Sequence, residues 1–179
     1  MSEFRPRLQR SLDPSQQAKY QSLVDRFRSL GAGDPEAWAR SEVTEDTPQL
    51  ATFRLLRCIW QEVIDAYGSS GGWMDSAIAA CEQDPDAPFA DAGAALKRLK
   101  EMGLNPADLA PVARFLAYEA VFGVRQILDE ANATDGSDRC PGWKLMEVGD
   151  DGGLTGRRIG GLHESVLGAD PSGREGRPA

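Results

Sequence analysis

The stretch VARFLAYEAVFGV, residues 112–124, decides the fold that we expect for this chain. Arg114 and Glu119 are its charged residues, and after Arg114 apolar residues cover nearly the whole circumference of a helix. A helix that is apolar on every side is buried by its neighbours. We therefore predict a central helix over residues 111–131, because Pro111 permits only a short turn before it.

Pairs that end in proline mark the starts of further helices. Proline fits the first helical position, and a preceding Asp, Thr or Asn side chain can cap the free backbone amides. Such pairs stand at residues 13–14, 34–35, 47–48 and 105–106. A second central helix is predicted over residues 48–67. Its broad apolar face comprises Phe53, Leu56, Ile59, Trp60, Val63, Ile64 and Tyr67.

The pattern changes towards the C-terminus. WKLMEV, residues 143–148, alternates as a strand does, and LTGRRI, residues 154–159, can return beside it. GDDGG, residues 149–153, lies between them and is a tight-turn signal. An isolated hairpin is marginally stable in water, so we expect it to pack on the helical body. A short final helix is predicted within GGLHESVLG, residues 160–168.

These elements predict a mainly α fold, or α+β by a strict count. We expect a compact helical domain of five or six helices, followed by a small C-terminal β-hairpin and a short final helix. The length of 179 residues suits one domain with such an appendage. The expected divisions are a flexible arm at 1–12, the helical domain at 13–134, the hairpin and short helix at 135–170, and a flexible tail at 171–179.

Composition narrows the class of function. The formal net charge of −8 opposes binding to nucleic-acid phosphates, which attract basic surfaces. No apolar run approaches the roughly 20 residues that span a bilayer, so we expect no membrane partner. The 3 cysteines are far apart and form no C-x-x-C pair, which favours a reducing cytoplasm over a disulfide framework.

His163, the single histidine, begins an incomplete metal motif. H-E-x-x-H needs a second histidine at the position of Leu167. His163 and Ser165 are two residues apart, so on a helix they point to different faces and do not form a catalytic pair. Composition alone would allow structural zinc with the ligands Cys58, Cys81, Cys140 and His163. We nevertheless expect neither a metal nor another cofactor, because buried free cysteines are common in helical cores.

RRIGG, residues 157–161, joins the second predicted strand to the final helix. Exposed amides at the two glycines would form a hollow for an anion, and the arginines would add positive charge. The full phosphate-binding signatures G-x-x-x-x-G-K-[ST] and G-x-G-x-x-G are absent. The alternative to a purely structural corner is therefore an anion site formed by Arg157, Arg158, Gly160, Gly161 and His163.

Glu119 is a candidate for a buried carboxylate because it lies inside FLAYEAVF, residues 115–122. Packing of two apolar helices around it would desolvate the carboxylate and raise its pKa, as an acid catalyst requires. Pairing with Arg54 or Arg57, or a surface position, is the other interpretation.

We expect the chain to be a non-catalytic, soluble protein-binding module, such as an inhibitor, an immunity-type protein or an adaptor. Acidic surface loops would attract another protein, preferably a basic one. The residues expected to bind this partner are Glu42, Glu45, Asp46, Glu82, Asp84 and Asp86. The alternative is a small enzyme or ligand binder that uses the anion site at residues 157–163.

Overall fold

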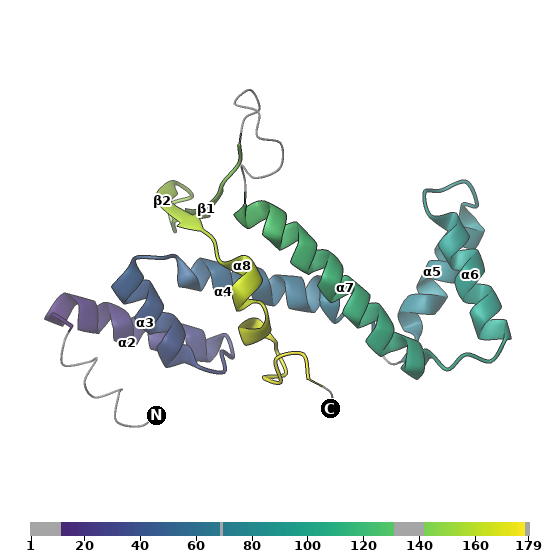
Figure 1. Cartoon of the computed structure of the whole chain (residues 1–179), viewed down its shortest axis with the longest axis horizontal. Coiled ribbons are helices and arrows are strands. Elements are labelled where there is room, and N and C mark those ends of the chain that lie inside the picture. The colour runs from purple at the N-terminus through teal and green to yellow at the C-terminus, as the bar shows by residue number, and fades with distance from the viewer. Residues whose placement is uncertain (1–11, 69, 131–141, 178–179) are drawn as a thin grey trace. The chain divides into compact units, whose positions relative to one another are not determined.

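The computed structural model describes residues 12–68, 70–130 and 142–177, and over these the chain is mainly helical (Figure 1). The helices are α2 (Pro14–Ser29), α3 (Pro35–Glu45), α4 (Gln49–Ile59), the π-helix η1 (Trp60–Ile64), α5 (Gly72–Gln83), α6 (Ala90–Glu101), α7 (Pro106–Asp129), α8 (Leu162–Ser165) and the 3-10 helix η2 (Leu167–Ala169). The strands are β1 (Leu145–Val148) and β2 (Leu154–Ile159). The predicted fold class is confirmed, with a C-terminal hairpin and a short final helix.

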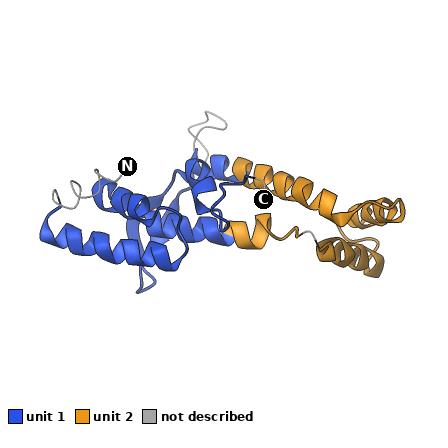
Figure 2. Ribbon diagram, turned by 90° about the horizontal axis from the view of Figure 1, so that it is seen from below, with its two compact units in different colours: residues 1–58, 124–179 blue, residues 59–123 orange. Residues whose placement is uncertain are grey.

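Two compact units share the chain (Figure 2). Unit 1 combines residues 1–58 with residues 124–179, and unit 2 is the continuous stretch 59–123. This division crosses the predicted helical domain and does not coincide with the boundary expected at residue 134. The segment 131–141, which includes the boundary expected at residue 134, lies outside the described residues.

The start of α2 follows the capping signal read from the sequence. The Asp13 side chain accepts hydrogen bonds from the backbone amides of Ser15 and Gln16, at 2.8 and 2.9 Å. The Gln16 side chain accepts from the Asp13 amide in return, which completes a capping box. Gly31 follows the helix with a φ of +75°, a conformation in which glycine is unstrained.

An aromatic cluster forms the core of unit 1. Phe27, Trp38 and Phe53 come from α2, α3 and α4, and their ring centroids lie 5.2–5.9 Å apart in the three pairs. Two of the three contacts are edge-to-face, the geometry that aromatic quadrupoles favour. The cluster therefore holds the first three helices together, and the same helices contribute the buried apolar residues Tyr20, Leu23, Val24, Ala39 and Leu56.

The C-terminal hairpin is antiparallel, as its alternating pattern predicts. Leu145 pairs with Ile159 and Val148 with Leu154, and the register shifts between these two pairs. In the turn, the Gly149 amide donates to the Gly153 carbonyl at 2.8 Å. The segment after the hairpin is fastened to the helices of unit 1, because the buried Arg125 of α7 donates to the Leu162 carbonyl at 2.6 Å.

The chain after η2 is organised by one buried carboxylate. Asp170 accepts hydrogen bonds from the backbone amides of Ser172 and Gly176, both at 2.8 Å. Residues 171–177, which we predicted to be part of a flexible tail, therefore form a hydrogen-bonded turn, and residues 178–179 lie outside the described part.

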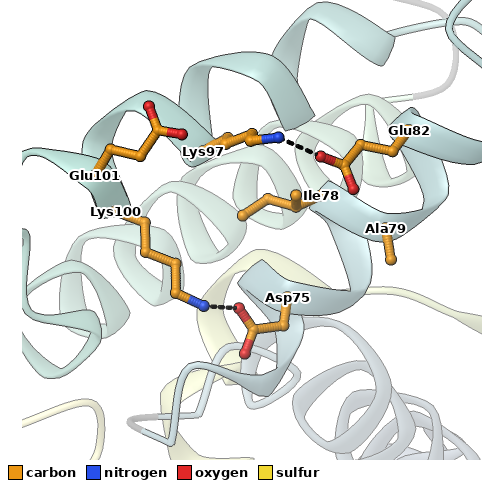
Figure 3. Close-up of a pocket in the computed structure, with 7 residues that line it drawn as sticks. All are labelled: Asp75, Ile78, Ala79, Glu82, Lys97, Lys100 and Glu101. Carbon is orange, nitrogen blue, oxygen red and sulfur yellow. Dashed lines mark hydrogen bonds and ion pairs between the residues drawn. The ribbon is translucent and has the colours of Figure 1, made fainter.

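Helices α5 and α6 form a helical hairpin within unit 2 and lie side by side (Figure 1). Gly93 of α6 lies where the two helices approach closely, because a Cβ atom added there would overlap the Cys81 side chain and lie 3.1 Å from the Ala77 carbonyl oxygen of α5. Two ion pairs, Lys97–Glu82 and Lys100–Asp75, join the helices at 2.6 Å each (Figure 3).

Helix α7 contradicts one expectation about burial. It runs for 24 residues through Pro111, and Ala110 and Ala117 lie on its buried side. The large apolar residues Val112, Phe115, Leu116, Val124 and Ile127 are exposed. The prediction of burial on all sides was wrong. Apolar residues around a helix show which surfaces it could bury, but they do not show how many neighbouring elements cover those surfaces.

Candidate functional site

Arg157 of β2 is held by carboxylates from two other elements. Its guanidinium donates to Glu147 of β1, at 2.8 Å from Nε and 2.6 Å from a terminal nitrogen. Both terminal nitrogens also donate to Glu42 of α3, at 3.2 and 3.3 Å. These bonds connect the hairpin to the first helices, and they leave Arg157 unsuited to the anion site that the sequence suggested.

Glu42 is correspondingly not a surface residue. Only 3% of it is exposed, and its second carboxylate oxygen accepts from the Leu50 amide at the start of α4, at 2.8 Å. A buried charge is stable when it is paired and hydrogen-bonded, and Glu42 has both kinds of partner. The expectation that Glu42 lies in an acidic surface loop was therefore wrong.

Arg157, Glu42 and Glu147 form a charged triad. Contacts within it lower the pKa of Glu147. Burial raises the pKa of its carboxyl, but hydrogen bonds from Arg157 and Thr155 outweigh this effect, and the pKa lies below its ordinary value of 4.5. A pKa that is lower in the folded state contributes stability above the unfolded-state pKa, and this contribution is lost as pH falls through the folded-state pKa.

We therefore expect Glu147→Gln to cost about 1–3 kcal/mol of unfolding free energy near neutral pH, because charge-assisted hydrogen bonds are lost. The difference from the wild type should shrink as pH falls below about 4.5, where the wild-type carboxylate is progressively protonated. Urea unfolding of both proteins across this range measures it. A difference that stays constant with pH would contradict the assignment.

A carboxylate of the chain itself, that of Asp129, lies at the strand-to-helix corner formed by Gly160 and Gly161. Asp129, at the end of α7, accepts hydrogen bonds at Oδ2 from the backbone amide of His163, at 3.2 Å, and from the His163 ring Nδ1, at 2.7 Å. Arg158 donates to the backbone carbonyl of Asp129 at 2.6 Å.

These contacts leave less positive charge free at this corner than the predicted anion site requires. The corner amide at His163 is satisfied by Asp129, Arg157 is bound by Glu42 and Glu147, and α8 has 4 residues, too few for a substantial helix dipole. The glycines keep their structural role, since Gly161 has a φ of +66°.

A cavity of about 490 Å³ opens beside the corner. Its walls come from the α3–α4 junction, the end of α7, β2 and α8. The lining residues are Glu45, Thr47, Pro48, Gln49, Thr52, Asp129, Arg158, Gly160, Gly161, His163, Glu164 and Ser165. Two buried oxygen atoms of the lining residues, Asp129 Oδ1 and Thr47 Oγ1, have no hydrogen-bond partner among the described residues.

The remaining acidic residues of the predicted partner site fall into two groups. Glu45 and Asp46 end α3 in unit 1, and Glu45 lines the cavity. Glu82, Asp84 and Asp86 lie at the exposed end of α5 in unit 2, where Glu82 is paired with Lys97. The structure therefore assigns them to separate units.

Glu119 is exposed, so the desolvation expected for a buried acid catalyst is absent. It lies on the open side of α7 with Val112, Phe115 and Leu116. Burial inferred from the apolar neighbours of Glu119 was wrong for the same reason as the predicted burial of α7.

A second cavity, of about 400 Å³, lies on the α5–α6 hairpin (Figure 3). Figure 3 shows Lys97 and Lys100 extending towards Glu82 and Asp75, and each lysine is paired. The pKa of Lys97 is raised by its hydrogen bond to Glu82. Charges that neutralise one another leave little to recognise a ligand, so this cavity is the weaker candidate.

Cysteine and metal chemistry find little support among the described residues. Cys58 is exposed and Cys81 half-buried, both as free thiols, and Cys140 lies outside the described part. Within that part no group of three or more His, Cys, Asp or Glu side chains is arranged to hold a metal ion. No helix in the described ranges combines the length and apolar character needed to cross a membrane.

Sequence reasoning missed Asp129 and Thr47, the two cavity residues with unused oxygens. Asp129 stands 34 residues before His163, at the start of a polar stretch that resembles a linker. No local pattern marks such a partner. The available signal was the single histidine itself, which requires some acceptor when its ring is partly covered.

Comparisons with protein-family models, curated proteins and solved structures found no match to this chain.

Proposed function

We propose that this chain is a non-catalytic protein-binding module, and that its partner docks a basic amphipathic helix on the open face of α7. The observation that carries the proposal is the exposure of three large apolar side chains on this face. Val112, Phe115 and Leu116 are 49%, 58% and 60% exposed. An exposed apolar cluster of this kind is typical of a protein-interaction site.

The three residues are spaced for recognition of a helix. Positions i, i+3 and i+4 lie on one side of an α-helix and form a short apolar ridge. An amphipathic helix of a partner can lay its own apolar stripe along such a ridge. Burial of one leucine or phenylalanine side chain is worth about 1.5–3 kcal/mol, so a few residues are sufficient for measurable affinity.

The carboxylates beside the apolar ridge favour a particular kind of partner helix. Asp108 precedes Val112 by one turn, and Glu119 follows Phe115 by one turn, so carboxylates bracket the apolar ridge. Both are exposed and neither forms an ion pair within the described part of the chain. A partner with basic residues beside its apolar stripe is favoured.

A second copy of this chain suits the face less well. In an antiparallel arrangement Asp108 of one copy would approach Glu119 of the other, and in a parallel arrangement each carboxylate would approach its own equivalent. Like charges across an interface are costly, and the net charge of −8 adds general repulsion. We therefore favour a basic partner over self-association.

The contacts of His163 support the non-catalytic part of the proposal. The ring of His163 is bound to Asp129 through Nδ1. Its Nε2 lies 3.7 Å from a Glu164 oxygen, and within the described ranges no hydroxyl or thiol donates to it. A nucleophile activated by histidine would need such a contact. The free thiols of Cys58 and Cys81 agree with a reducing, cytoplasmic location.

Two synthetic amphipathic helices test the proposal. Both carry leucines on one face, and one carries lysines and the other glutamates beside them. We expect saturable binding of the lysine peptide, weakened by salt, and much weaker binding of the glutamate peptide. Phe115→Ser should reduce affinity about ten- to a hundredfold, as measured by fluorescence anisotropy.

Leu154→Ser serves as the matched control because Leu154 is also strongly exposed but lies in the hairpin. It should bind the lysine peptide as the wild type does. Equal binding of both peptides, or an equal loss with both variants, would overturn the proposal. A dimer in sedimentation experiments that dissociates in Phe115→Ser would instead identify a second copy as the occupant.

A further inference from the structure

The cavity beside the strand-to-helix corner contains a carboxylate that is only half used. Asp129 is 91% buried, since 9% of its side chain is exposed. Its Oδ2 accepts two hydrogen bonds from His163, whereas its Oδ1 accepts none among the described residues. A buried charged oxygen without a partner is costly, and a ligand that donates to it would remove that cost.

The contact with Asp129 also decides which ring nitrogen of His163 donates a hydrogen bond. An ionised carboxylate can only accept, so the ring Nδ1 carries the proton that points to Asp129. The other ring nitrogen, Nε2, lies 3.7 Å from a Glu164 oxygen. Thr47 Oγ1 is a further buried oxygen with no hydrogen-bond partner in the described part. The cavity lining therefore contains two buried oxygens without a hydrogen-bond partner among the described residues, and one of them belongs to a carboxylate.

The charged side chains around the cavity are mainly negative. Glu45, Asp129 and Glu164 contribute carboxylates. Arg158 is the opposing charge, and its guanidinium already donates to the Asp129 carbonyl. This excess of negative charge disfavours an anion and favours a cation.

We propose that this cavity binds an organic cation that carries an amino or guanidino group. Such a group supplies several N–H donors and a positive charge, which match Asp129 Oδ1 and the surrounding carboxylates. The volume of about 490 Å³ is that of an ordinary small-ligand site. A metal ion fits less well, because the described residues offer no set of three ligands. The site is independent of the α7 face.

Small probes of opposite charge test the sign of the ligand. We expect n-butylguanidinium and n-butylammonium to shift the backbone NMR signals of Asp129 and His163 in a saturable manner, and butyrate and inorganic phosphate to leave them unchanged. Shifts with the anions but not the cations would overturn the proposal. Absence of saturation by either cation at tens of millimolar would also overturn it.

Asp129→Asn keeps the shape of the side chain and removes its charge, so cation affinity should fall at least about tenfold. Asp84→Asn, in unit 2, is the matched control and should have no effect. Arg158→Met guards against misfolding of the first variant, because Arg158 is exposed. Removing its competing charge should raise cation affinity severalfold, whereas an anion site would lose affinity.

A short acetylated and amidated peptide with a single central arginine separates two sources of the same chemistry. Affinity at least about tenfold higher than that of n-butylguanidinium would identify a peptide side chain as the ligand. Equal affinities would identify a free small molecule. Binding of the guanidinium probe that survives unchanged in Asp129→Asn would contradict the assignment in either case.

Discussion

Arg157→Met should lower the free energy of unfolding by about 3–5 kcal/mol, because it leaves the buried carboxylate of Glu42 without its cationic partner. Methionine preserves most of the side-chain volume, so loss of packing contributes little. The carboxylate of Glu147 would lose the same partner. Denaturant unfolding that follows the signals of unit 1 measures the effect.

Two variants separate the charge from other effects of the substitution. Arg158→Met removes an exposed arginine from the next position of the same strand and should cost less than about 1 kcal/mol. Adding Glu42→Gln to Arg157→Met removes the unpaired charge and keeps an acceptor for the Leu50 amide. The double variant should therefore recover part of the loss. A loss in Arg157→Met no larger than in Arg158→Met would refute the role of the triad.

Gly93→Ala is expected to separate α5 from α6 locally and to cost about 1–3 kcal/mol, the usual price of an atom forced into a packed interface. The added Cβ would overlap Cβ and Sγ of Cys81, and the Cys81 Cβ cannot rotate away because it is bonded to the backbone. The effect opposes the general rule, because alanine in a helix interior is normally more stable than glycine by about 0.5–1 kcal/mol.

Gly123→Ala is the matched control, since no atom lies within 4 Å of a Cβ added at that glycine of α7. We expect it to stabilise slightly or to be neutral. Native-state hydrogen exchange is the measurement of choice, because it reports the opening of α5 and α6 separately from unit 1. Cys81→Gly in the Gly93→Ala background should restore part of the protection. Equal behaviour of the two glycine variants would disprove the close approach.

Local signals accounted for much of the fold. The Asp13–Pro14 pair produced the expected cap of α2, and the alternation around Leu145 produced β1. Capping, turn formation and side-chain periodicity depend on residues a few positions apart, so a single sequence contains them. The place of the candidate cavity was also foreseen in part, since the glycine corner and His163 line it.

Long-range pairing was beyond the reach of those signals. Glu42 was expected at the surface because it was assigned to an acidic loop, and its burial depends on Arg157. The sign of the corner site depends on Asp129, which no local motif connects to His163. The open face of α7 likewise follows from how few neighbours reach it. Each of these features is a tertiary event that local spacing does not encode.

The separation of Glu42 and Arg157 along the chain also means that they are synthesised at different times. Arg157 is synthesised 115 residues after Glu42. A ribosome that adds about 5–20 residues per second needs roughly 6–23 s for that stretch. Unit 2 is continuous and emerges within this interval, so its helices can pair while unit 1 waits for its second half. Until the hairpin has been synthesised, the Glu42 carboxylate has to stay in water. Unit 1 can therefore complete its folding only at the end of synthesis.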